Sequence, residues 1–119
     1  MNANPVMISA KLLIECLERE IGLWAIVWEV RYQMNDETYP LIQDDMSRPD
    51  EVRQVVLEVV KRLLAHGVFV AEFKEDGSGL MLWKEPAEVA FSRVVEFWNS
   101  LDREPTMTDN IFFVFDSTS

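Results

Sequence analysis

Apolar residues recur along much of this chain at spacings of three and four, the period of a helix that is buried on one side. Near the start, Leu12, Leu13, Cys16 and Leu17 follow this spacing. Ser9 precedes them, and a serine hydroxyl caps a helix N-terminus well. The pattern predicts a helix from Ser9 to Glu20, which Gly22 then breaks or bends.

The next apolar segment, Leu23 to Met34, fits two periods. Alternate positions are apolar, as in a strand, and Trp24, Val27 and Trp28 also follow helical spacing. Helix is favoured and strand remains an alternative. Because apolar residues lie on nearly all sides in either conformation, we expect the segment to run through the core.

A clearer helix follows a polar loop at Asn35 to Arg48. Ser47 can cap it, and Pro49 suits the first helical position. The helix should reach His66, because Gly67 is a typical helix stop. Its apolar face consists of Val52, Val55, Val56, Val59, Val60, Leu63 and Leu64.

The remaining pattern predicts a hairpin, a helix and a last strand. Val68 to Lys74 and Leu80 to Lys84 read as strands joined by a glycine-containing turn. A helix opens at Pro86, and Ile111 to Phe115 is a short apolar strand that we expect beside the hairpin. The predicted fold class is α+β and winged-helix-like: three to four helices with a small antiparallel sheet made of the hairpin 68–84 and strand 111–115.

Composition indicates one domain over residues 1–119. The chain is 49% hydrophobic, which is enough to build a core. Its uncharged runs are too short for a bilayer span, and its start lacks the features of a secretory signal. Cys16 is the single cysteine and reads as a small buried side chain. We therefore expect a cytoplasmic protein, a monomer or weak dimer, with no membrane partner.

The negative charge is concentrated in one segment. Of the formal charge of −10, the segment from Asn35 to Glu51 carries −5. Such a segment repels nucleic acid and attracts basic protein. The helix that follows it offers only Arg53, Lys61 and Arg62 as positive groups, too few for the basic stripe of a DNA-binding helix. We expect no nucleic-acid partner.

Candidate chemistry is sparse. One cysteine and one histidine cannot supply a zinc site, and the acidic segment lacks the ligand order of a calcium loop. No glycine-rich loop precedes a helix, so we expect no cofactor. His66 is placed to cap a helix C-terminus. Acid/base catalysis by Asp44 and Asp45 is the least favoured alternative.

The aromatic residues divide into two groups. One group falls on apolar faces and should pack in the core: Trp24, Trp28, Phe91, Phe97, Trp98 and Phe113. Tyr39, in the acidic loop, and Trp83, at the end of a hairpin strand, are candidates for exposure. An aromatic residue among acidic ones is typical of a binding anchor.

Several short stretches of the sequence resemble those of a group of small, uncharacterised bacterial proteins with a winged-helix-like core. The resemblance spans roughly residues 22 to 116, departs at Asn110–Phe113, and implies a fold without catalytic residues. It rests on Gly22–Val27, Leu63–Val68, Trp83 before Glu85–Glu88, and Phe97–Trp98 before Asp102–Pro105. In size and acidity the chain is also similar to immunity proteins that neutralise basic nuclease toxins, such as those of contact-dependent inhibition.

The leading hypothesis is a non-enzymatic binding protein of this immunity type. Its carboxylates would pair with lysine and arginine of a toxin domain, and one tyrosine would anchor the centre. The predicted partner-binding residues are Asp36, Glu37, Tyr39, Asp44, Asp45, Asp50 and Glu51. The alternative is a winged-helix-like regulatory or protein-interaction module that does not bind DNA directly.

Overall fold

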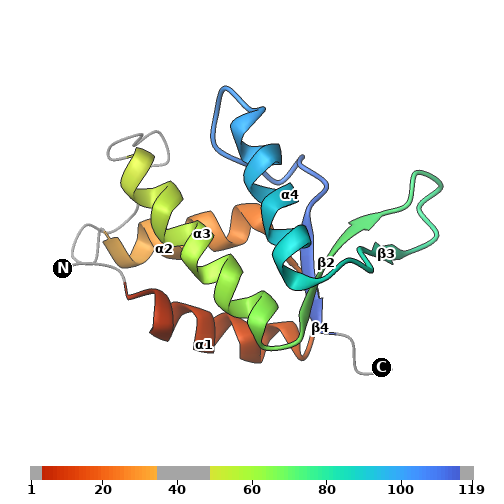
Figure 1. Ribbon diagram of the computed structural model, residues 1–119, viewed down its shortest axis with the longest axis horizontal. Helices are drawn as coiled ribbons and strands as arrows, with labels where there is room; N and C mark the ends of the chain where they lie inside the picture. The colour runs from red at the N-terminus through yellow and green to blue at the C-terminus, as the bar shows by residue number, and fades with distance from the viewer. Residues whose placement is uncertain (1–3, 35–48, 116–119) are drawn as a thin grey trace.

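The computed structural model describes residues 4–34 and 49–115, and within them it shows an α+β fold (Figure 1). The elements in chain order are α1 (Pro5–Cys16), β1 (Ile21–Gly22), α2 (Leu23–Met34), α3 (Pro49–Ala65), β2 (Val68–Phe73), β3 (Leu80–Leu82), α4 (Ala87–Asn99) and β4 (Phe112–Phe115). The predicted α+β class, with three to four helices and a small antiparallel sheet, is confirmed. The predicted loop 35–48, with its Ser47 cap, lies outside the described residues.

Helix α1 begins and ends earlier than predicted. Asn4 is the N-cap, and its Oδ1 accepts hydrogen bonds from the backbone N–H of Val6 at 2.9 Å and of Met7 at 3.4 Å. Ser9 lies inside the helix, where its hydroxyl donates to the carbonyl of Val6. The predicted Ser9 cap is therefore wrong, because an asparagine followed by Pro5 supplies both a cap and a pre-set first residue upstream.

The ambiguous segment is helix α2, so the favoured prediction is confirmed and the strand alternative is wrong. Its position in the core was predicted less well. One side is buried, at Leu23, Ile26, Val27, Val30 and Met34. The other side leaves Trp28 50% and Tyr32 48% exposed. The helix therefore lies along the margin of the core, and the predicted burial of Trp28 is wrong.

Helix α3 is the centre of the molecule. It packs against α1, α2 and α4 (Figure 1), and its fully buried positions include Val52, Val56, Val59 and Val60. Pro49 opens it as predicted, and Gly67 follows it with a φ of +91°, which glycine adopts without steric cost. His66 Nδ1 lies 2.7 Å from the carbonyl oxygen of Arg62, as expected for a residue in the last turn.

The four strands form one antiparallel sheet in the order β1-β4-β2-β3. The predicted strand 111–115 is β4, and it pairs with β2 of the hairpin as expected. It also pairs with β1, a strand that the sequence pattern did not predict. Phe113 lies opposite Ile21 on one side and Val70 on the other, and these three residues belong to the core. The winged-helix likeness stays a prediction.

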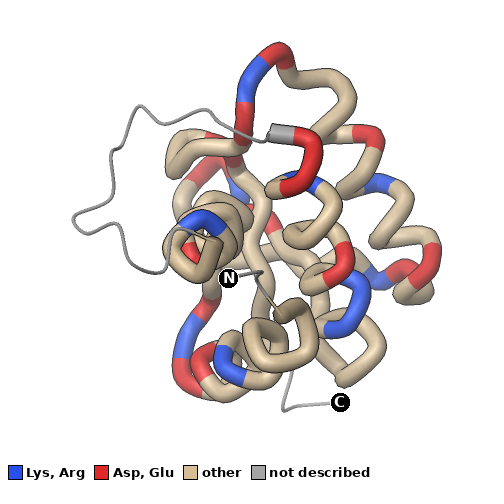
Figure 2. Tube along the Cα trace, turned by 90° about the vertical axis from the view of Figure 1, so that its left-hand side faces the viewer, with Lys and Arg blue, Asp and Glu red and all other residues tan. Residues whose placement is uncertain are grey.

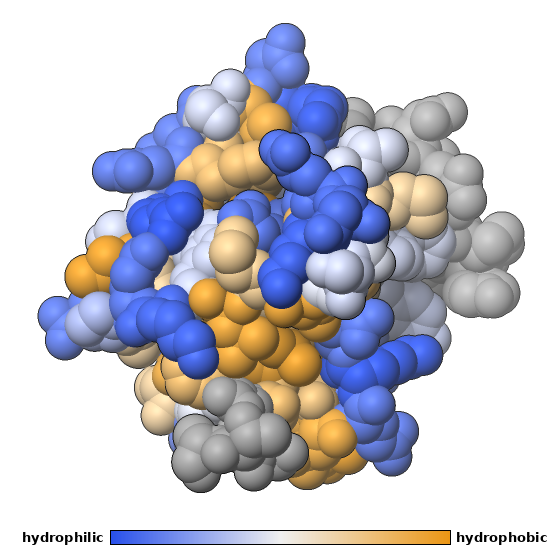
Figure 3. Space-filling view, turned by 90° about the vertical axis from the view of Figure 1, so that its right-hand side faces the viewer, coloured by the Kyte–Doolittle hydropathy of each residue, from blue (hydrophilic) through white to orange (hydrophobic). Residues whose placement is uncertain are grey.

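The other face of the sheet is apolar as well. Phe69 and Val114 are half-buried there, and the rings of Phe73 and Phe112 meet edge to face with centroids 4.8 Å apart. Figure 3 shows apolar side chains gathered between charged margins on the side of the molecule that carries the sheet. Among the residues described, no helix has the length and hydropathy needed to cross a membrane.

Candidate binding site

The structure places two of the predicted partner-binding residues. Asp50 and Glu51 are exposed in the first turn of α3, where the helix dipole favours negative charge (Figure 2). The other predicted residues lie outside the described part of the chain: Asp36, Glu37, Tyr39, Asp44 and Asp45. The acidic segment thus ends in a carboxylate pair with a defined position, at the start of the central helix.

Several basic side chains of the described residues are already paired with carboxylates of the same chain. The ion pairs are Lys11–Glu29 at 3.0 Å, Arg62–Glu58 at 3.2 Å, Arg103–Asp109 at 2.8 Å, Arg31–Glu104 and Arg93–Glu85. The two charges of each pair cancel, so these pairs add nothing to the net charge of −10, half of which the segment 35–51 carries. They also fix side chains between elements, as between α1 and α2.

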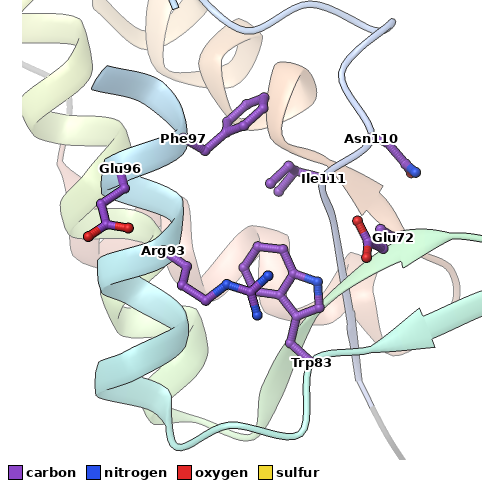
Figure 4. Close-up of a pocket in the computed structure, with 7 residues that line it drawn as sticks. All are labelled: Glu72, Trp83, Arg93, Glu96, Phe97, Asn110 and Ile111. Atoms are coloured by element: carbon purple, nitrogen blue, oxygen red, sulfur yellow. The ribbon is translucent and has the colours of Figure 1, made fainter. Parts of the chain in front are cut away.

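A pocket of about 430 Å³ lies between α4 and the β2–β3 hairpin (Figure 4). Its lining residues come from four parts of the chain: Glu72 on β2, Trp83 just after β3, Arg93, Glu96 and Phe97 on α4, and Asn110 and Ile111 before β4. We call this the α4–hairpin pocket. The lining consists of two carboxylates, one guanidinium, one indole, one amide and two apolar side chains, and includes no serine, cysteine or histidine.

Local backbone pairing positions Trp83 in this pocket. The Trp83 N–H donates to the carbonyl of Val70 at 2.8 Å, which extends the β2–β3 pairing by one residue beyond Leu82. Side chains alternate along a strand, so Trp83 faces the same side of the sheet as Val70. Helix α4 crosses that side, and Trp83 is only 8% exposed. The predicted exposure of Trp83 is therefore wrong.

The guanidinium group of Arg93 lies over the face of the Trp83 indole ring. The guanidinium carbon of Arg93 lies 3.9 Å from the ring centroid, and Arg93 also pairs with Glu85. Among the residues that the structure describes, the buried indole Nε1 has no hydrogen-bond partner. A buried donor without an acceptor costs about 1–3 kcal/mol.

Two carboxylate residues belong to the lining, Glu72 from β2 and Glu96 from α4, while Arg93 pairs with Glu85. Figure 4 draws the Glu72 carboxylate on the side of the indole nitrogen and the Glu96 carboxylate on the side of α4 away from Trp83 and Ile111. Both polar atoms of the Asn110 amide are hydrogen-bonded to the Phe73 backbone. The pocket therefore combines apolar walls with the carboxylate of Glu72 at one side.

A smaller cavity of about 210 Å³ lies between α1 and α3 and includes Ser9 and His66. The Ser9 hydroxyl donates to the carbonyl of Val6, and His66 Nδ1 lies within hydrogen-bond distance of the carbonyl oxygen of Arg62, so each side chain contacts the backbone of its own preceding turn. Across the described residues, no group of three or more His, Cys, Asp or Glu side chains could hold a metal ion.

Cys16 is buried at 2% exposure, as the sequence indicated. Its Sγ lies 3.8 Å from the carbonyl oxygen of Phe113, a weak hydrogen bond between α1 and β4. Burial raises the pKa of this thiol to about 11, which keeps it protonated at neutral pH. A protonated, enclosed thiol has a packing role.

The α4–hairpin pocket was missed at the level of sequence, although part of its signal is present. Met81 and Trp83 alternate with Leu80 and Leu82 along the strand, and Arg93 and Phe97 are one helical turn apart. These spacings indicate a shared face within each element. They do not indicate that the two faces meet.

Comparison of the chain with protein-family models, with curated proteins and with solved structures finds no match. Function is therefore argued from the charge distribution and from the α4–hairpin pocket. The resemblances to small winged-helix-like proteins and to immunity proteins stay predictions.

Proposed function

We propose that the protein is a non-enzymatic acidic binding protein that acts in the cytoplasm and neutralises a basic, nuclease-type toxin domain. The observation that carries the proposal is the concentration of charge: segment 35–51 holds half of the net charge of −10. The described end of this segment, Asp50 and Glu51, is exposed on the first turn of a rigid central helix.

Charge of this kind acts on a basic partner in two ways. At a distance it steers the encounter and raises the association rate, an effect that falls as salt is added. In contact, carboxylates that lose their water to arginine or lysine give short, charge-assisted hydrogen bonds. A nuclease must carry positive charge to hold its polyanionic substrate, so the surface that an inhibitor needs to cover is the one that this segment attracts.

The test compares two variants of equal charge. One variant replaces Asp36, Glu37, Asp44 and Asp45 by lysine. The control replaces four carboxylates elsewhere by lysine, at exposed positions of the described chain: Glu18, Glu20, Glu75 and Asp102. Each variant is co-expressed with basic nuclease domains encoded beside its gene, and cell survival and the affinity of the purified pair are measured.

We expect the unaltered protein and the control variant to protect cells and to bind, and the segment variant to lose both properties. Equal affinity of the segment variant and the unaltered protein would defeat the proposal. So would failure of the unaltered protein to protect against any neighbouring nuclease domain.

A regulatory module that works through protein contacts is the second candidate. The succession of α3, Gly67 and the β2–β3 hairpin favours it, because a helix followed directly by a hairpin is the arrangement of a winged helix. Neighbouring genes of metabolism, without a toxin gene, would favour this alternative. A gel-shift assay tests the accompanying expectation that the protein does not bind duplex DNA.

A further inference from the structure

We infer that the α4–hairpin pocket binds a small neutral amide with an apolar body. The carbonyl oxygen of the amide accepts a hydrogen bond from the Trp83 indole N–H, and its own N–H donates to the Glu72 carboxylate. The inference goes beyond the proposed function, because it concerns a small molecule and no residue of the segment 35–51. Either one can fail while the other stands.

The first observation is a buried donor that lacks an acceptor. Trp83 is more than nine-tenths buried, and its Nε1 has no hydrogen-bond partner among the described residues. The ring is fixed in place, because its backbone N–H donates to the Val70 carbonyl and the Arg93 guanidinium lies over its face. In Figure 4 the nitrogen edge of the indole faces the side of the pocket where Glu72 is drawn. A ligand on that side should therefore offer a hydrogen-bond acceptor.

The second observation is an acceptor on the same side. Across the described part of the chain, no hydrogen bond or ion pair joins the Glu72 carboxylate to another residue. An ionised carboxylate accepts hydrogen bonds and donates none. An anionic ligand would satisfy the indole N–H and be repelled by Glu72, whereas a cation would attract Glu72 and leave the N–H without an acceptor. The two groups together select a neutral ligand that carries an acceptor beside a donor.

An amide has this pair of groups. A primary carboxamide presents its oxygen and its N–H at the same end of one planar group, and it is uncharged at neutral pH. Trp83, Phe97 and Ile111 supply apolar walls against which the rest of the molecule can be buried. The pocket volume of about 430 Å³ is within the range of roughly 300–1,000 Å³ that is usual for small-molecule sites. The volume therefore leaves room for a ring or a branched chain beside the amide.

Entry of the ligand requires a movement of Glu72. The Trp83 Nε1 atom is enclosed by its neighbours, and the half-buried Glu72 side chain is the group drawn beside it (Figure 4). Turning this side chain outward breaks no hydrogen bond with a described residue. Turning it inward would let the carboxylate accept the indole N–H directly and would close the site. The experiment distinguishes these two arrangements.

The probes are four small molecules that share a phenyl ring and differ in one planar group. Benzamide carries the acceptor and the donor, acetophenone has a methyl group in place of the donor, benzoate is an anion, and benzamidinium is a cation without an acceptor. Each is titrated into the full-length protein up to its solubility, and the indole N–H resonances are followed by heteronuclear NMR. Comparison with the Trp83→Phe variant assigns the Trp83 resonance among the four tryptophans of the chain.

We expect benzamide to move the Trp83 N–H resonance in a saturable way, and benzoate and benzamidinium to leave it in place. Acetophenone should bind about 10-fold more weakly than benzamide, the factor expected for one lost hydrogen bond to a charged group. Glu72→Gln removes the repelling charge and should allow benzoate to move the resonance. Glu96→Gln is the matched control, because Figure 4 draws that carboxylate away from Trp83, and this variant should still exclude benzoate.

Four results would overturn the inference. The first is no movement of the Trp83 resonance with benzamide, which is the outcome expected if Glu72 itself accepts the indole N–H. The second is equal affinity for benzamide and acetophenone, and the third is equal affinity for benzamide and benzoate in the unaltered protein. The fourth is the same response to benzoate in the Glu72→Gln and Glu96→Gln variants.

Discussion

The side-chain amide of Asn110 is hydrogen-bonded twice to the backbone of Phe73. The Phe73 N–H donates to Asn110 Oδ1 at 2.8 Å, and Asn110 Nδ2 donates to the Phe73 carbonyl at 2.9 Å. Ala71 pairs with Phe112 in the sheet, so the same register, continued by two residues, would set Phe73 opposite residue 110. The amide thus continues the β2–β4 pairing after the backbone of β4 has left it.

Asn110→Ala removes both hydrogen bonds and should lower the free energy of unfolding by about 1–2 kcal/mol. Asn110→Asp should be at least as unfavourable, because a carboxylate faces the Phe73 carbonyl without a donor. Urea unfolding followed by circular dichroism measures the change, with Ser92→Ala, an exposed position on α4, as the control. An unchanged midpoint for Asn110→Ala would show that the pair does not stabilise the sheet.

Asp109 should make stability fall in acid. Hydrogen bonds from Arg103 hold the pKa of Asp109 below its usual value of 3.8, and the backbone N–H of Thr106 acts in the same direction. Because the pKa is lower in the folded state, the stabilisation is fully present above 3.8 and is lost as the pH falls through the folded-state pKa.

The free energy of unfolding of Asp109→Asn should therefore depend less on pH in the acid range than that of the unaltered protein. Denaturant unfolding at a series of pH values measures the slope. Ser92→Ala, an exposed and non-titrating position on α4, is the control and should keep the original slope. Parallel curves for Asp109→Asn and the unaltered protein would contradict this assignment.

The Cys16 thiol should react slowly while the protein is folded. Its pKa of about 11 lies two units above the ordinary value of 9.0, so the thiolate fraction at neutral pH is about a hundredfold lower. Enclosure between α1 and β4 lowers the rate further. A colorimetric thiol assay with and without denaturing urea measures both rates, and similar rates in the two conditions would be inconsistent with a buried thiol.

Gly22 has no room for a side chain. A Cβ at this position would lie 2.5 Å from Trp24 Nε1 and 2.6 Å from Trp24 Cδ1. Gly22→Ala must therefore displace the Trp24 ring and should cost about 1–3 kcal/mol in thermal or urea unfolding. Adding Trp24→Ala, which removes both clashing atoms, should make the double variant less unstable than the sum of the two single changes predicts. A double variant no better than the sum of its single changes would rule out this contact as the cause.

Local signals account for the elements that the sequence predicted well. Pro49 and Gly67 bound α3 through their own backbone preferences, and the turn glycines mark the hairpin. The start of α1 was misplaced because two residues of the same capping class, Asn4 and Ser9, compete, and only Asn4 is followed by proline. Strand β1 is two residues long, too short to give a period.

The predictions that depended on contact between distant elements were the weak ones. The sequence places Trp28 and Trp83 in segments rich in apolar residues, but the exposure of each side chain depends on which helix lies across it. Trp28 is on the open side of α2, whereas Trp83 is covered by α4. The acidic segment was recognisable because charge is a property of composition, and the α4–hairpin pocket was not, because it exists only after α4 folds back over the hairpin.

The interior position of β4 has a consequence for synthesis. Strands β1 and β2 do not pair with each other, and the strand between them, with fully buried Phe113, follows both in the chain. The pairing of β1, and one of the two edges of β2, therefore waits until residues 112–115 have been synthesised.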